Sequence, residues 1–291
     1  MPKPIKGENY LPPKGQLSVS SLFGVDGKVC VVTGGGSGIG AMIAAGYCAN
    51  GATVYITSRK DTSEYAKELT NRGPGKCVAL QGDLSKEEGV MTLLENLRRL
   101  EPNGIHVLFN NAGTNWSEPF EQYSLKGWDR VYDLNVRAVF HVTQKLTPLL
   151  EKTATRSEPA RVINVSSIDA ESVTALPTFA YSSGKAAVIR LTKVMAGHLV
   201  NRNITCNAIL PGAFPSRMMR ATMAAAGDAM AKSIPRGRVG DIKDMAGACV
   251  FLGSRASAWM TGTTLVVDGG ALMRVDPRNM PNYESGKNAK L

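Results

Sequence analysis

Tyr181 and Lys185 lie four positions apart in the run Tyr-Ser-Ser-Gly-Lys, and that spacing places both side chains on one face of a helix. A free phenol has a pKa of about 10, so acid–base work near neutral pH needs about 3 units, or about 4 kcal/mol, from its surroundings. One ammonium about 4 Å away supplies roughly 4 kcal/mol at an effective dielectric constant near 20. The pair is therefore a candidate for proton transfer, with Lys185 predicted to lower the pKa of Tyr181.

The same Tyr-x-x-x-Lys pattern occurs twice more, at Tyr10–Lys14 and Tyr283–Lys287, so the context must decide between the three. Two prolines interrupt the first copy, and the second lies in a polar tail, so neither is expected to hold helical geometry. Tyr181 alone follows a predicted strand and opens a long predicted helix.

Ser167 is the second candidate, fourteen residues before Tyr181 at the end of the run Val-Ile-Asn-Val-Ser-Ser. Its hydroxyl could hydrogen-bond a substrate carbonyl and polarise it. Ser166 is the competitor for that role, and two serines that simply terminate a strand are the structural alternative.

A glycine cluster follows the apolar run Val29–Thr33, with Gly34, Gly38 and Gly40 spaced as T-G-x-x-x-G-x-G. The apolar run predicts a buried strand, and the glycines allow a tight turn into a helix with no side chains in the way. The free N–H groups and positive dipole end of that helix would suit a pyrophosphate. An ordinary strand-to-helix turn fits the same residues.

The second predicted strand ends in Ser58-Arg59-Lys60. A carboxylate at this place holds the ribose 2′-hydroxyl of NAD, whereas an arginine accommodates the 2′-phosphate of NADP. Arg59 therefore favours NADP, and a surface arginine in a loop is the alternative. Asp83 follows the third strand, where it could also cap the next helix.

These motifs, in this order from about residue 24 to 272, resemble the short-chain dehydrogenase/reductase family, and within it the rhamnolipid-pathway type of 3-oxoacyl reductase. The resemblance implies that Asp83 faces the adenine amine, that Asn-Asn-Ala-Gly at 110–113 lies along the cofactor, and that Asn135 holds a water behind the catalytic lysine. It implies four catalytic residues: Asn135, Ser167, Tyr181 and Lys185. The implied cofactor contacts are Gly34, Ser37, Gly38, Ile39, Gly40, Arg59, Lys60, Asp83, Leu84, Asn111, Ala112, Gly113, Tyr181, Lys185, Pro211, Gly212 and Phe214.

The family resemblance implies NADPH-dependent reduction of a ketone to a secondary alcohol, and the subgroup resemblance suggests a 3-oxoacyl thioester, including acyl-CoA, as substrate. A secondary-metabolite ketone or polyketide intermediate is the alternative, because specificity lies in loops. A dinucleotide-sensing regulator is disfavoured, since it would not need Ser167, Tyr181 and Lys185 together. Trp116, Phe179 and Met218 are candidate walls of the substrate pocket.

The elements that must position these residues alternate between strand and helix. Such alternation, with a glycine-rich first turn, predicts a single-domain, doubly wound α/β fold of the Rossmann type, a parallel sheet with helices on both faces. Residues 1–22 are expected to form an extended arm, 23–272 the reductase domain and 273–291 a flexible tail. The expected strands are 28–33, 52–57, 76–81, 105–110, 161–166, 204–210 and 263–268. One expected helix begins at 39, and the others cover 61–72, 86–100, 123–151, 178–201 and 241–253. The Met-rich segment 217–234 is either irregular or a helix packed on the core.

The bulk properties exclude several classes. The net charge of +10 is spread along the 291 residues without a dense basic run, which argues against nucleic acid. No stretch is apolar for long enough to span a membrane. Five cysteines without a C-x-x-C pair predict buried reduced thiols, and three scattered histidines predict no metal site.

The chain ends in Ala289-Lys290-Leu291, which differs by one hydroxyl from the Ser-Lys-Leu address of peroxisomes. We therefore expect a peroxisomal location and an import receptor as a partner if the source is a eukaryote, and a cytoplasmic location otherwise. The family resemblance implies a homodimer or homotetramer.

Overall fold

The computed structural model describes residues 15–174 and 176–273, and the Ala289-Lys290-Leu291 tripeptide lies outside them. Seven parallel strands form one sheet in the order β3-β2-β1-β4-β5-β6-β7. The predicted doubly wound parallel sheet is confirmed. The strands are β1 Val29–Thr33, β2 Thr53–Ser58, β3 Lys76–Gln81, β4 Val107–Asn110, β5 Ala160–Val165, β6 Ile204–Pro211 and β7 Thr264–Val267.

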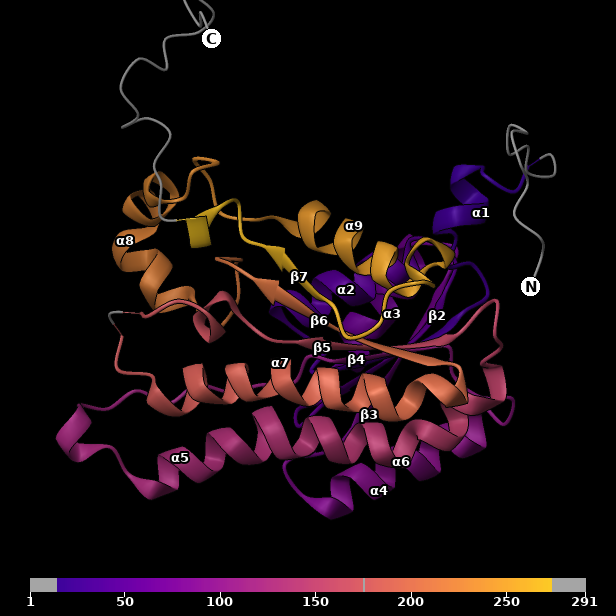
Figure 1. Ribbon diagram of the computed structural model, residues 1–291, viewed down its shortest axis with the longest axis horizontal. Helices are drawn as coiled ribbons and strands as arrows, with labels where there is room; N and C mark the ends of the chain where they lie inside the picture. The colour runs from indigo at the N-terminus through magenta and orange to yellow at the C-terminus, as the bar shows by residue number, and fades with distance from the viewer. Residues whose placement is uncertain (1–14, 175, 274–291) are drawn as a thin grey trace, which may run out of the picture.

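Helices cover both faces of the sheet, as Figure 1 shows. On one face, the apolar sides of α4 Glu87–Leu100, α6 Ala138–Thr153 and α7 Phe179–Leu199 pack with the strands into one core. On the other face, α2 Gly38–Cys48, α3 Ser63–Arg72 and α9 Ile242–Gly253 form a second core. No helix among the described residues is long and apolar enough to cross a bilayer.

A short helix, α1 Val19–Phe23, lies where the sequence predicts an extended arm, so the prediction is wrong for these residues. The side chain of Ser18 caps this helix by accepting a hydrogen bond from the Ser21 N–H at 3.1 Å. The ring of Phe23 packs 6.3 Å from that of Phe251 on α9. One capping hydrogen bond and one aromatic contact stabilise this single helical turn. The prolines of the predicted arm all precede it in the sequence.

The predicted long helix over 123–151 is interrupted. It consists of a 3₁₀ turn, η1 Phe120–Gln122, then α5 Leu125–Tyr132, a π turn, η2 Asp133–Arg137, and α6. The Ala138 N–H donates to the carbonyl of Asp133, five residues back. Single π turns inside helices occur frequently at functional sites, and this one contains Asn135.

The Met-rich segment between β6 and α9 forms a helix, α8 Arg220–Ser233. Of the two structures that its sequence allows, the helix is therefore the one adopted. The 3₁₀ turns η3 Ile168–Ala170, η4 Val200–Arg202, η5 Arg255–Ser257 and η6 Ala271–Met273 complete the described chain.

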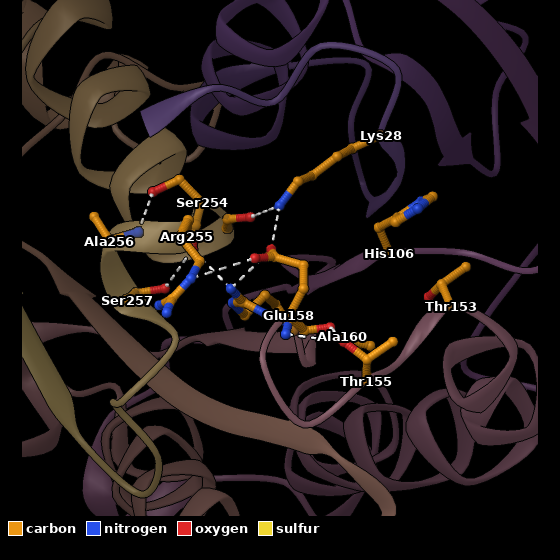
Figure 2. Close-up of polar contacts among 12 residues, drawn as sticks. Lys28, His106, Thr153, Thr155, Glu158, Ala160, Ser254, Arg255, Ala256 and Ser257 are labelled. Carbon is orange, nitrogen blue, oxygen red and sulfur yellow. Dashed lines mark hydrogen bonds and ion pairs between the residues drawn. The ribbon is translucent and has the colours of Figure 1, made fainter. Parts of the chain in front are cut away.

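The amino-terminal ends of β1 and β5 meet the end of α9 in a cluster of charged side chains (Figure 2). The Lys28 ammonium lies 2.7 Å from a Glu158 carboxylate oxygen, and the Arg161 guanidinium lies 3.2 Å from the same oxygen. Arg161 is 1% exposed and also donates to the carbonyl of Ser254 at 2.8 Å. This cluster fixes the edge of the sheet opposite to the carboxyl ends of the strands.

Candidate active site

A cleft of about 490 Å³ opens at the carboxyl ends of the strands, the edge at which open parallel sheets bind their ligands. Segments that follow β1, β2, β3, β4, β5 and β6 all contribute to it. Of the predicted cofactor contacts, these residues line it: Gly34, Ser37, Gly38, Ile39, Arg59, Asp83, Leu84, Asn111, Ala112, Gly113, Tyr181 and Lys185.

The glycine turn after β1 has the shape of a phosphate cradle. Gly34 and Gly38 adopt φ values of +66° and +57°, a conformation that side chains disfavour. A Cβ at Gly40 would lie 2.4 Å from the amide nitrogen of Asn111. Helix α2 begins at Gly38, and its first N–H groups have no acceptor within the helix, as at every helix start. The Ser37 hydroxyl makes no capping hydrogen bond to them. These donors and the missing side chains fit a pyrophosphate.

Asn111 and Thr33 hold the end of β4 against this turn. The Asn111 amide donates to the carbonyl of Thr33 at 2.8 Å and to that of Gly34 at 3.2 Å. The Thr33 hydroxyl accepts hydrogen bonds from the N–H groups of Asn111 and Ala112, both at 2.9 Å. Sequence reasoning did not assign Thr33 a role, although its place directly before the first glycine was the available signal.

Arg59 and Asp83 lie together where β2 and β3 end. The backbone carbonyl of Arg59 accepts a hydrogen bond from the Gln81 side chain at 2.9 Å, and Arg59 lines the cleft. Burial raises the pKa of the Asp83 carboxyl, but hydrogen bonds from Ser85 and the nearby Arg59 charge outweigh it, and the pKa is lowered. Asp83 thus lines the cleft as a carboxylate. Lys60 is exposed and lies outside the cleft lining.

Tyr181 and Lys185 project from the first turns of α7 into the cleft. The Lys185 ammonium donates to the carbonyl of Val165 at 2.7 Å and lies 5.6 Å from the centre of the Tyr181 ring. Burial lowers the pKa of Lys185 to about 8, against an opposing effect of the Asp169 carboxylate.

The pKa of Tyr181 differs from the sequence prediction. Burial raises it to about 12, while a hydrogen bond with Ser167 lowers it and the Asp169 charge raises it further. The expectation that Lys185 lowers the pKa of the phenol toward neutral pH is therefore wrong for the protein alone, because the loss of hydration is the largest effect on that pKa and raises it.

The two serines after β5 have separate partners. The Ser166 hydroxyl is buried and donates to the carbonyl of Lys185 at 2.7 Å, so it is committed to the start of α7. The Ser167 hydroxyl accepts a hydrogen bond from the Asp169 N–H at 3.1 Å and is the partner of the Tyr181 phenol. The geometry favours Ser167 over Ser166 as the group that faces a reacting carbonyl.

Asn135 is 1% exposed and lies in the π turn. Its amide oxygen accepts from the Thr114 N–H at 2.8 Å, and its amide nitrogen donates to the Thr114 carbonyl at 2.9 Å. A Cβ at Gly113 would lie 3.4 Å from the Asn135 oxygen and 3.7 Å from the Lys185 nitrogen. Asn135 therefore anchors the segment after β4 beside Lys185.

Several predicted residues lie elsewhere. Phe214 is 3% exposed and packs against Gly240 in the α2–α9 core. Gly212 packs on Asp268. The cleft lining does not include Gly40, Pro211, Gly212 or Phe214. Of the candidate pocket walls, Met218 lines the cleft. Phe179 instead lines a second cavity of about 660 Å³ together with Phe120 and Tyr123. Trp116 lies against Gly127, with the Arg130 guanidinium 5.5 Å from the centre of its ring.

Ser166, the competitor of Ser167 in the sequence, lines the cleft, whereas Ser167 is not part of that lining. Further cleft residues were not anticipated: Thr57, Ser58, Gly82, Thr114, Asn115, Leu134, Val165, Ser216 and Arg217. Most of them neighbour a predicted residue in the chain, so proximity was the available signal. The described residues contain no group of three or more side chains suited to hold a metal ion.

The family model described as enoyl-(acyl carrier protein) reductase matches residues 34–271. A rhamnolipids biosynthesis 3-oxoacyl-[acyl-carrier-protein] reductase from Pseudomonas aeruginosa is 41% identical over 251 residues, which are 85% of this chain and 97% of that protein. The short-chain dehydrogenase/reductase PhomF from Diaporthe leptostromiformis is 32% identical over 281 residues, with 88% and 95% covered.

Among solved structures, the Pseudomonas aeruginosa RhlG/NADP active-site complex is similar, with a TM-score of 0.82 and 40% identity. The match covers 86% of this chain and 98% of that one. The likeness therefore extends over the whole sheet and both helical layers.

Proposed function

The chain belongs to the short-chain dehydrogenase/reductase family, and we propose that it reduces a ketone to a secondary alcohol with NADPH. The observation that carries this is the position of Tyr181 and Lys185 beside the glycine turn in one cleft, with the Tyr181 phenol hydrogen-bonded to Ser167. A 3-oxoacyl thioester, on an acyl carrier protein or as an acyl-CoA, is the proposed substrate, because the relative at 41% identity is a 3-oxoacyl-[acyl-carrier-protein] reductase.

NADP is the cofactor, and the chain's residues fit it. The pyrophosphate would lie on the glycine turn and the first N–H groups of α2, and the 2′-phosphate near Arg59. When bound, NADPH supplies the hydride. The similar RhlG structure is a complex with NADP.

In the proposed mechanism, the Ser167 hydroxyl donates a hydrogen bond to the substrate carbonyl oxygen and polarises it. Tyr181 gives its phenolic proton to that oxygen as the negative charge develops. A phenol with a pKa of about 12 is fully protonated at neutral pH, which suits the acid of a reduction. The Lys185 ammonium then stabilises the phenolate and binds the cofactor ribose, and Asn135 supports the proton relay that restores Tyr181.

The test is NADPH and NADH oxidation by the purified protein with acetoacetyl-CoA and longer 3-oxoacyl-CoA thioesters. We expect turnover that prefers NADPH, and a preference for NADH would contradict the role of Arg59. If NADPH binds tightly but no thioester reacts, the substrate is instead a specialised ketone, such as a secondary-metabolite or polyketide intermediate.

Tyr181→Phe separates an enzyme from a dinucleotide-sensing regulator. We expect cofactor binding to persist and turnover to fall by about 10²- to 10⁴-fold, the usual contribution of a positioned acid. Tyr132→Phe is the matched control, because its hydroxyl bonds Ser183 at 3.1 Å outside the cleft. Equal loss in both variants would contradict the role of Tyr181.

We further propose a homodimer or homotetramer, which hydrodynamic mass can test. The residues Ala289-Lys290-Leu291, outside the described part of the chain, support a peroxisomal location through an import receptor if the source is a eukaryote.

A further inference from the structure

Arg217 is an exposed cation in the segment between β6 and α8, and it lines the cleft. Within the described part of the chain, its guanidinium has neither a hydrogen bond nor an ion pair. The other cations of the lining have other positions or partners: Arg59 lies at the end of β2, and Lys185 is buried and bonded to Val165. Arg217 therefore brings a free positive charge to the cleft that the proposed function does not use.

The neighbouring residue places this charge beside the glycine turn. A Cβ built on Gly38 would lie 3.0 Å from the Cβ and 3.5 Å from the Cα of Ser216, so the β6–α8 segment runs directly over the first residue of α2. The Ser216 hydroxyl accepts a hydrogen bond from the Met219 N–H at 3.2 Å, which fixes the backbone on both sides of Arg217. The side chain of Arg217 thus starts one residue from the point where the two segments touch.

The charged groups around the glycine turn favour an anionic ligand. The first N–H groups of α2 carry a partial positive charge, and of the cleft-lining side chains the one carboxylate, Asp83, lies at the end of β3 and bonds Ser85. Two positive groups that line one cleft beside a glycine turn attract a phosphate, and an arginine binds phosphate with several directed N–H groups.

We propose that Arg217 binds the pyrophosphate of the dinucleotide from the side opposite the α2 N-terminus. The proposal rests on the proposed function, because it takes NADP(H) as the ligand. It assigns the two cleft arginines to different phosphates: Arg59 to the 2′-phosphate, which only NADP has, and Arg217 to the pyrophosphate, which NADP and NAD share.

The experiment measures dissociation constants of NADPH and NADH by calorimetry for the full-length protein, without substrate. Arg217→Gln is expected to weaken both dinucleotides by the same factor, about 10- to 100-fold, the usual cost of one lost charged hydrogen-bond partner. Arg217→Lys should restore part of that loss. Arg59→Gln is expected to weaken NADPH and leave NADH unchanged.

Arg220→Gln is the matched control, since Arg220 is an exposed arginine three residues further on and lies outside the cleft lining. It should leave both dissociation constants unchanged, and equal weakening by Arg217→Gln and Arg220→Gln would overturn the proposal as a general charge effect.

Three other results would overturn the proposal. Unchanged binding of both dinucleotides by Arg217→Gln would remove Arg217 from the cofactor site. Weaker binding of NADPH alone would assign Arg217 to the 2′-phosphate. Unchanged dinucleotide binding with a raised KM for a CoA thioester would assign it to the substrate. Failure of the proposed function itself is distinct, because it would appear as an absence of ketone reduction by the unaltered protein, whereas this experiment measures dinucleotide binding without substrate.

Discussion

Lys185 is the residue whose charge the proposed chemistry requires and whose position makes that charge costly. The residue is 4% exposed, and burial lowers its pKa to about 8. A lysine with a lowered pKa is protonated below that value and loses its charge as the pH rises through it. The side chain that stabilises the Tyr181 phenolate is thus still mostly charged at neutral pH, but it loses that charge just above the physiological range.

We expect kcat/KM for reduction to decrease as the pH rises through about 8, because neutral Lys185 no longer stabilises the phenolate. Lys185→Arg keeps a charge at every accessible pH, so the residual activity of this variant should not decrease over the same range. The measurement is a pH profile from 6 to 10 at saturating NADPH. A flat profile of the unaltered enzyme up to pH 9.5 would contradict the assignment.

At the scale of elements, α2 must lie close to α9 for the glycine turn to keep its place. A Cβ at Gly46 on α2 would lie 2.7 Å from the Cβ of Ala246 on α9, so the two backbones approach at this glycine. Gly247, the next residue on α9, has open space around its Cα. Neighbouring glycines in the same helical layer therefore have opposite requirements.

Gly46→Ala should destabilise the protein by about 1–3 kcal/mol, the usual cost of overpacking. Gly247→Ala should stabilise it by about 0.5–1 kcal/mol, because alanine is the better helix former. Urea unfolding of both variants measures the difference. Equal effects of the two substitutions would show that the α2–α9 contact is not tight.

The element order and most of the cleft could be predicted, because hydrophobic periodicity and strand-end motifs are local properties of the chain. The π turn could not, since one extra residue in a turn leaves the apolar pattern of 123–151 nearly unchanged. The positions of Phe179 and Phe214 were also out of reach. Phe179 at the start of α7 lines the second cavity and Phe214 after β6 packs into the α2–α9 core, and both positions depend on segments distant in the sequence.

The pKa of Tyr181 was mispredicted for a related reason. The spacing of Tyr181 and Lys185 is visible in the sequence, but the loss of hydration depends on the chain segments that close over the phenol. Desolvation is a property of the assembled fold, and here it is the largest effect on the pKa and outweighs the hydrogen bond from Ser167.

At the scale of the whole molecule, Glu158 is the carboxylate that pairs with the partly buried Lys28 and the buried Arg161 at the edge of the sheet away from the cleft. Glu158→Gln would leave Lys28 and the buried Arg161 without a negative partner, so we expect a loss of about 1–3 kcal/mol of unfolding free energy. The expected loss is smaller than for a fully buried ion pair because the Glu158 side chain is 37% exposed.

Glu151→Gln is the control for this substitution, because Glu151 pairs with Arg202 on the surface and such pairs contribute about 0–1 kcal/mol. Thermal and urea unfolding at pH 7 give the comparison, and NADPH binding should be unchanged in both variants. A loss of cofactor binding in Glu158→Gln would contradict a purely structural role.

The five cysteines all lie in the two cores, and burial raises the pKa of each thiol. Peroxides and electrophiles attack the thiolate, so neither its ionisation nor its accessibility favours reaction in the folded chain. The thiols of the folded enzyme are consequently protected from oxidants and alkylating reagents, and damage to its cysteines begins only after the fold has opened.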